Sequence, residues 1–228
     1  PQFGTTIARE FLRSIGKTGG RFIPVIDTDK ALSMDDMAQR VREWQRVEPD
    51  YLERRRMKYK VAPTQQERVM REDDFIISKT DLKGRLTYCN RIFIEFSGFT
   101  ESELLGSQHN IIRHPDMPRG VFKLLWDTVS KGDEIFAYVK NMSKDGGFYW
   151  VLANVTPNRD LQGNIEGYFS ARRKPNRGGI SAASDLYRSM LDEENRAGPR
   201  DACAASLAMV NGILTQKGLS YEQFVLSL

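Results

Sequence analysis

The spacing of apolar residues changes twice along the chain. Before about residue 60 and after about residue 176, apolar side chains recur at helical spacing, whereas the central part alternates short β-rich stretches with turn residues. We therefore predict a helical N-terminal extension over residues 1–69, a domain over 70–175 and a helical C-terminal extension over 176–228. A length of 228 residues suits one domain with extensions.

Two helices are predicted in the N-terminal extension. The first covers residues 7–15 with an apolar face, and Gly19 and Gly20 would end it. The second starts at Ser33 as N-cap and runs to Pro49. A basic run follows at residues 54–60, which is typical of the solvated face of a helix but also suits a patch for phosphate or acidic partners.

The central region predicts strands over 75–80, 85–89, 135–142, 148–156 and 165–171. Three helices separate the second strand from the third: one over 91–96, one capped by Thr100 and Glu103, and one starting at 116–118. The order predicts an α+β domain in which helices cover one face of a five-stranded antiparallel sheet.

Helical spacing returns in the C-terminal extension, around residues 186–191 and 203–214, and Ser220 with Gln223 would cap a last short helix. Together with the N-terminal helices, these apolar stripes exceed the area that one face of a small sheet can cover. We therefore predict that the flanking helices form a homodimer or dock a signalling partner.

Composition narrows the class of protein. Hydrophobic residues make up 40% and charged residues 28%, and no apolar run is long enough to cross a membrane. The two cysteines, Cys89 and Cys203, fit a reducing compartment, so we expect a cytoplasmic protein. The net charge of +4 comes from the N-terminal third, and no nucleic-acid motif accompanies it, so no nucleic-acid partner is expected.

Motifs of hydrolases, kinases, dinucleotide dehydrogenases and zinc proteases are missing, so we do not expect an enzyme. His109 and His114 are the two histidines, and their spacing does not place them on one helical face, so no metal site is expected.

The most polar stretch, residues 107–118, lies between apolar helices and allows two interpretations. In the structural one, Asp116 caps the following helix, Arg113 pairs with Asp116, and His114 is an ordinary half-buried residue. In the functional one, Arg113 and His114 contact an anionic or heteroaromatic ligand. Its aromatic walls would be Phe122, Trp126 and Trp150.

Several motifs carry a family resemblance. The segment Asn90–Thr100, the following Glu103–Gly106 and the turn Lys144–Gly146 before Tyr149 and Trp150 resemble a PAS domain over about residues 70–175. More narrowly, Arg113–Pro118 with Phe122, Trp126 and residues 139–141 resembles the flavin-binding PAS domains of bacterial aerotaxis receptors. The resemblance implies a PAS fold whose pocket between sheet and helices holds FAD and senses redox state or oxygen. It further implies that the cofactor is bound by Asn90, Arg113, His114, Asp116, Phe122, Trp126 and Asn141, with Trp150 beside them.

Departures from that family keep other functions open. His109 stands where LOV domains have their adduct-forming cysteine, so we expect no LOV-type thiol photocycle. Neither a signalling coiled coil nor a membrane anchor accompanies the PAS segment, which predicts a stand-alone sensor. The alternatives are a PAS interaction or assembly subunit without a redox cofactor, a haem gas sensor with His109 or His114 as axial ligand, and a flavin enzyme.

Overall fold

The computed structural model describes residues 61–228 and, from the first sixty residues, the strands 12–18 and 21–26. The chain divides into two compact units, Pro1–Lys60 and Val61–Leu228. The helix predicted from Ser33 and the basic run at 54–60 lie outside the described residues.

The first unit contains an antiparallel pair, β1 (Leu12–Thr18) and β2 (Arg21–Ile26). The helix predicted over residues 7–15 is therefore wrong from Leu12 onward. A two-residue Gly-Gly connection suits a tight hairpin, and β-branched residues on both sides favour strands over helix. The structure pairs residues 12–18 with 21–26 as antiparallel strands, where the sequence was expected to form a helix that ends.

The second unit is built on a five-stranded antiparallel sheet, which confirms the predicted fold class. Its strands are β3 (Ile76–Asp81), β4 (Leu86–Cys89), β5 (Ile135–Met142), β6 (Phe148–Arg159) and β7 (Ile165–Arg173). Their order in the sheet is β4-β3-β7-β6-β5, so the last strand, β7, lies at the centre and β4 and β5 form the edges. Strands β6 and β7 extend beyond the predicted ends because their pairing continues to Arg159 on β6 and to Arg173 on β7.

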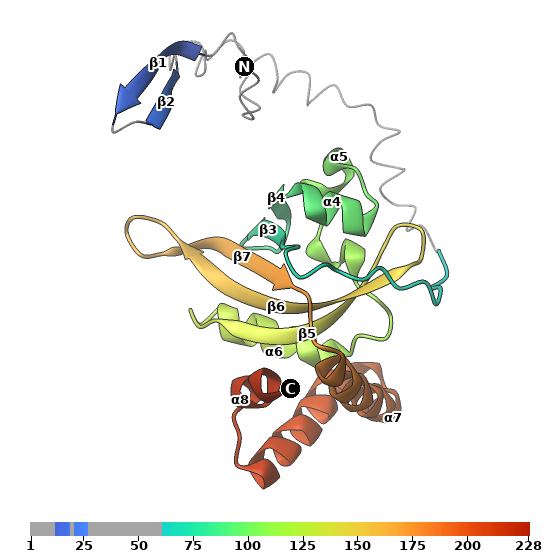
Figure 1. Ribbon diagram of the computed structural model, residues 1–228. Coiled ribbons are helices and arrows are strands. Elements are labelled where there is room, and N and C mark those ends of the chain that lie inside the picture. Colours follow the sequence, from blue (N-terminus) through green and yellow to red (C-terminus); the bar gives the residue numbers. More distant parts are fainter. Residues whose placement is uncertain (1–11, 19–20, 27–60) are drawn as a thin grey trace. The chain divides into compact units, whose positions relative to one another are not determined.

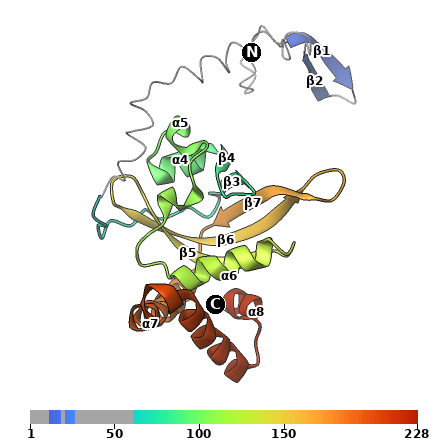
Figure 2. The ribbon, with the colours of Figure 1, turned by 180° about the vertical axis from the view of Figure 1, so that it is seen from behind.

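The helices between β4 and β5 are α4 (Arg91–Ser97), α5 (Glu101–Leu104), the 3-10 helix η2 (His109–Ile112) and α6 (Arg119–Val129). The predicted capping box of Thr100 and Glu103 is present at α5. Figures 1 and 2 show α4 and α5 beside β3 and β4, with α6 alongside β5 and β6.

The C-terminal extension packs on the domain rather than away from it. Helix α7 (Arg177–Lys217) is interrupted at Gly198, which has a φ of 79° and precedes Pro199. Helix α8 (Tyr221–Ser227) has the predicted capping box of Ser220 and Gln223. Both helices contact β5, and α7 also contacts α6 (Figure 2). No helix within residues 61–228 is both long and apolar enough to span a membrane.

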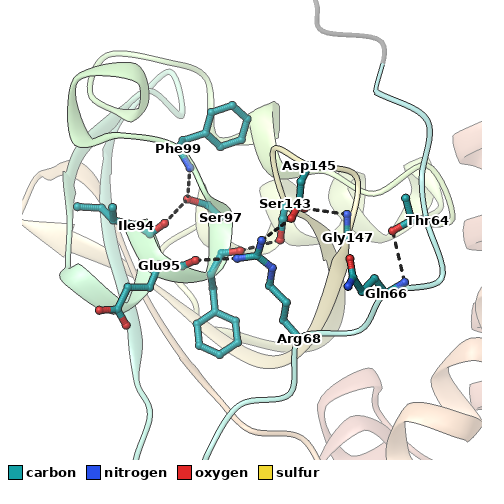
Figure 3. A network of polar contacts seen from close by, with 11 residues as sticks. Thr64, Gln66, Arg68, Ile94, Glu95, Ser97, Phe99, Ser143, Asp145 and Gly147 are labelled. Carbon is teal, nitrogen blue, oxygen red and sulfur yellow. Dashed lines mark hydrogen bonds and ion pairs between the residues drawn. The ribbon is translucent and has the colours of Figure 1, made fainter.

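The segment before the sheet closes one end of the unit. The Arg68 amide donates to the Phe148 carbonyl (2.7 Å) at the start of β6. Its guanidinium donates to the Glu95 carbonyl (2.9 Å) in α4 and to Asp145 Oδ2 (2.6 Å) in the β5–β6 turn (Figure 3). Residues 64–68 therefore tie α4 to that turn.

Candidate functional site

The sheet has an inner face toward α4, η2 and α6, and an outer face. Tyr149 on β6 meets Phe96 of α4 edge-on, with ring centroids 5.4 Å apart, and so lies on the inner face. Neighbouring strand residues point to opposite faces. Trp150 accordingly lies on the outer face, where it stacks on Tyr187 of α7 at 6.4 Å. The structure therefore does not place Trp150 beside the other predicted cofactor-binding residues on the inner face.

Polar atoms without a hydrogen-bond partner gather on the inner face. Strand register puts Tyr149 on β6 opposite Asn141 on β5, and it puts Tyr168 on β7 opposite Thr80 on β3. Ser170 and Arg172 lie on the same face as Tyr168, because they alternate with it along β7. We call five residues the inner polar cluster, because each has a buried, unpartnered polar side-chain atom: Thr80, Asn141, Tyr149, Ser170 and Arg172. An unsatisfied buried polar group costs about 1–3 kcal/mol. Native proteins rarely leave several together, so this face fits a bound group with matching polar edges.

Arg172 is the charged member of this cluster. Its Nη2 donates to Ser78 Oγ (2.9 Å) and lies 2.6 Å from His109 Nε2. The guanidinium also lies 5.4 Å from the centroid of the Phe93 ring, on which His109 stacks. Burial, and secondarily the Arg172 charge, lowers the pKa of His109 to about 3, so its imidazole is neutral at physiological pH.

Three predicted residues come together at the end of β5. Arg113 forms an antiparallel bridge with Asn141, so the segment before α6 runs along the edge strand. The Arg113 guanidinium lies 4.6 Å from the Phe122 ring centroid and donates to the Met117 carbonyl (2.8 Å). Burial lowers the pKa of Arg113, while the charge of Glu194 acts in the opposite direction. Arg113 thus joins Phe122 through its side chain and Asn141 through its backbone, and these three residues form one group.

His114 and Asp116 take other partners. The His114 ring meets Phe148 edge-on at 6.0 Å, and its Nδ1 accepts the Asp116 amide (3.1 Å). Burial, and then the nearby Lys140 charge, lowers the pKa of His114 to about 4. Asp116 pairs with Lys140 at 2.6 Å. In the structural interpretation Arg113 was to pair with Asp116, and this is wrong.

Asn90 and Trp126 have structural surroundings. The Asn90 side-chain oxygen accepts the amides of Ile77 and Phe93, and its Nδ2 donates to the Phe75 carbonyl, so Asn90 caps α4 and fastens it to β3. Trp126 is 37% exposed and meets Tyr168 edge-on at 5.3 Å. It therefore lies at the margin of the inner face rather than at its centre.

The sequence did not indicate the residue that caps α6. The helix begins at Arg119, without a side-chain cap from its own N-terminal residues, and not at Asp116 as predicted. Glu194 of α7 replaces that cap: its carboxylate accepts the amides of Arg119 (3.0 Å) and Gly120 (2.8 Å) and the hydroxyl of Ser206 (2.9 Å). An anion at a helix N-terminus is stabilising, and this one is 6% exposed.

Arg172 was also missed, although a signal was present. It alternates with Ser170 and Tyr168 on β7, so a charged residue stands on the face that strand periodicity assigns to the core. Buried charges are rare unless they are paired or functional.

Residues 86–171 match the family model described as a PAS fold. This chain contains a PAS domain. Over 127 residues it is 40% identical to the aerotaxis receptor of Escherichia coli (strain K12), a match that covers 56% of this chain and 25% of that protein. Over 97 residues it is 29% identical to the nitrogen fixation regulatory protein of Klebsiella pneumoniae, covering 42% and 20%. The matches thus span a quarter or less of these relatives.

The PAS domain is also similar to the light-state structure of the blue-light photoreceptor Aureochrome1 LOV, with 25% identity and a TM-score of 0.43, covering 50% of this chain and 90% of that one. The predicted resemblance to the PAS domain of aerotaxis receptors is confirmed. These two relatives are named for aerotaxis and for regulation of nitrogen fixation, so this is a PAS domain homologous to those of signal-transduction sensors.

Proposed function

We propose that the PAS domain binds a flavin, FAD, between the inner face of the sheet and α4, η2 and α6, and senses redox state or oxygen. The observation that carries this proposal is the inner polar cluster. A flavin ring has apolar faces and an edge of hydrogen-bonding atoms, so it suits a buried site lined by aromatic rings and unpartnered polar atoms. The 40% identity to an aerotaxis receptor supports the same function.

The group of Arg113, Phe122 and Asn141 suits the rest of such a ligand. Asn141 Nδ2 is a buried donor without a partner, and an amide can hydrogen-bond to the polar edge of a ring. Arg113 is a cation that can form charge-assisted bonds to a phosphate. A bound flavin would supply electron-transfer chemistry, and these side chains would bind and orient it.

Haem fits the two histidines less well. The Arg172 guanidinium lies 2.6 Å from His109 Nε2, and a cation there opposes ligation of an iron ion by that nitrogen. The Nδ1 atom of His114 accepts the Asp116 amide, so the proton of the neutral ring is on Nε2, and that nitrogen has no lone pair for an iron ion.

The output would pass through the C-terminal helices. Glu194 joins α7 to the first residues of α6, which follow directly on the segment that pairs with Asn141. A shift of that segment would therefore change the packing of α7, and with it a surface offered to a second copy of the chain or to a signalling protein. The setting would be the cytoplasm.

The test is reconstitution of the full chain. Protein stripped of bound ligand is incubated with FAD, desalted and scanned for the band of oxidised flavin near ~450 nm. We expect Asn141→Ala to retain less FAD than wild type. Asn154→Ala is the matched control, because Asn154 lies on the outer face and pairs with Glu134. Wild-type protein that remains colourless would refute flavin binding and favour an interaction module.

A further inference from the structure

Arg172 is a buried cation without a counter-charge. It is 4% exposed, and its Nη1 has no hydrogen-bond partner. None of the ion pairs found within residues 61–228 includes it. The partners of Nη2, Ser78 and His109, are neutral, so Nη2 has two hydrogen-bonding neighbours and Nη1 has none.

This arrangement is costly for the protein alone. Burial lowers the pKa of Arg172 to about 10, so the guanidinium is still charged at physiological pH. Charges taken out of water are normally paired, and an unpaired one destabilises the fold. Ser170 and Tyr149, whose unpartnered oxygens share the inner face, add further unsatisfied groups. A ligand with an electron-rich acceptor would satisfy the guanidinium.

Resting on the flavin proposed above, we propose that Arg172 contacts the electron-accepting ring and stabilises the negative charge that the ring gains on reduction. The surroundings favour the ring over a phosphate, because the guanidinium lies over the flat, apolar Phe93 ring, 5.4 Å from its centroid. One electron from an external reductant such as dithionite lowers the charge of the ring by one, with no bond formed or broken. The fixed guanidinium stabilises that charge in a medium of low dielectric constant. Arg172 would therefore raise the reduction potential of the bound ring.

The experiment compares Arg172→Met and Arg172→Lys with Arg173→Met in the full chain. Arg173 is the matched control, because it is the next residue on β7, faces the outer side and is exposed. Affinities for FAD and for riboflavin, which has no phosphate, are measured together with the reduction midpoint potential and with the Tm of the ligand-free protein. We expect Arg172→Met to weaken binding of both flavins about 10- to 100-fold. Its midpoint should be lower than that of wild type.

The ligand-free protein gives an independent readout. Because Arg172→Met replaces an unpaired buried charge by an apolar side chain, its ligand-free Tm should equal or exceed that of wild type. Arg172→Lys keeps the charge and should keep the midpoint closer to wild type, and Arg173→Met should change none of these quantities.

Three results would overturn the inference. A lower Tm for Arg172→Met with unchanged affinities and midpoint would show a structural role. Weaker binding of FAD but not of riboflavin would place the guanidinium at the phosphates. Wild-type protein that takes up neither flavin would remove this inference and the proposed function together, whereas the first two results leave flavin binding standing.

Discussion

Replacing Glu194 by alanine tests how firmly the C-terminal helices hold α6. The carboxylate accepts hydrogen bonds from the amides of Arg119 and Gly120. Because Gly120 is buried, water cannot replace the carboxylate as the partner of its amide. An orphaned buried donor costs about 1–3 kcal/mol, and losing an anion at a helix N-terminus costs about 0.3–1 kcal/mol more. The Ser206 hydroxyl retains its contact with the Cys203 carbonyl (3.4 Å) and adds little.

We therefore expect Glu194→Ala to lower the free energy of unfolding by about 1–4 kcal/mol. At about 2–4 °C per kcal/mol for a domain of this size, the Tm should fall by roughly 3–16 °C. Glu194→Gln keeps one acceptor oxygen but turns an amide N–H toward a backbone N–H, so its loss should be about half as large.

Urea unfolding followed by circular dichroism measures these losses, with Glu193→Ala as control. Glu193 precedes Glu194 on the same helix and pairs only with Arg196 at the surface, a contact that contributes about 0–1 kcal/mol. If the Glu194 and Glu193 variants lose the same amount, the buried carboxylate does not cap α6, and the route proposed from pocket to α7 loses its basis.

Three further perturbations address packing, pH and the two faces of the sheet. Gly120→Ala would bring a Cβ within 2.3 Å of the Ser206 hydroxyl, so we expect the free energy of unfolding to fall by about 1–3 kcal/mol in urea unfolding. Adding Ser206→Gly should restore part of that stability, and no recovery would contradict this contact. The pKa of His114 is about 4 in the folded protein and 6.5 for an ordinary histidine, so the unfolded chain binds more protons between these values and stability falls as pH drops through that window. Between pH 7 and pH 5, His114 should contribute on the order of 2 kcal/mol to the loss measured by urea unfolding, so the loss should be smaller by about that amount in His114→Gln; an equal loss in both proteins would refute the assignment. Trp150→Ala should lower the Tm with FAD affinity unchanged in fluorescence titration, whereas Trp126→Ala should weaken FAD binding with a smaller change in Tm; the reverse pattern would place Trp150 in the pocket.

Local features of the chain were largely predictable from the sequence. The five strands follow from β-rich runs between turn residues, and the capping boxes at Thr100 and Ser220 follow from a spacing of three residues. The hairpin at residues 12–26 was missed because a short apolar pattern fits either period, and pairing with β2 decided between them.

The site was predictable only in part, because it depends on which side chains meet across the sheet. Sequence motifs placed Arg113, Phe122 and Asn141 in one group, and the structure brings them together. The same motifs included Trp150, but the alternation of side chains along β6 turns it to the outer face.

Two charged residues could be understood only from the tertiary structure. Glu194 caps a helix that begins 75 residues earlier, a distance over which no local spacing rule applies. Strand periodicity assigns Arg172 to the buried face, but only the structure shows that the partners of Nη2 are neutral and that Nη1 has none. Hydrophobic periodicity and helix capping depend on residues a few positions apart, so they can be predicted from the local sequence. Whether a buried charge is paired depends on the whole fold.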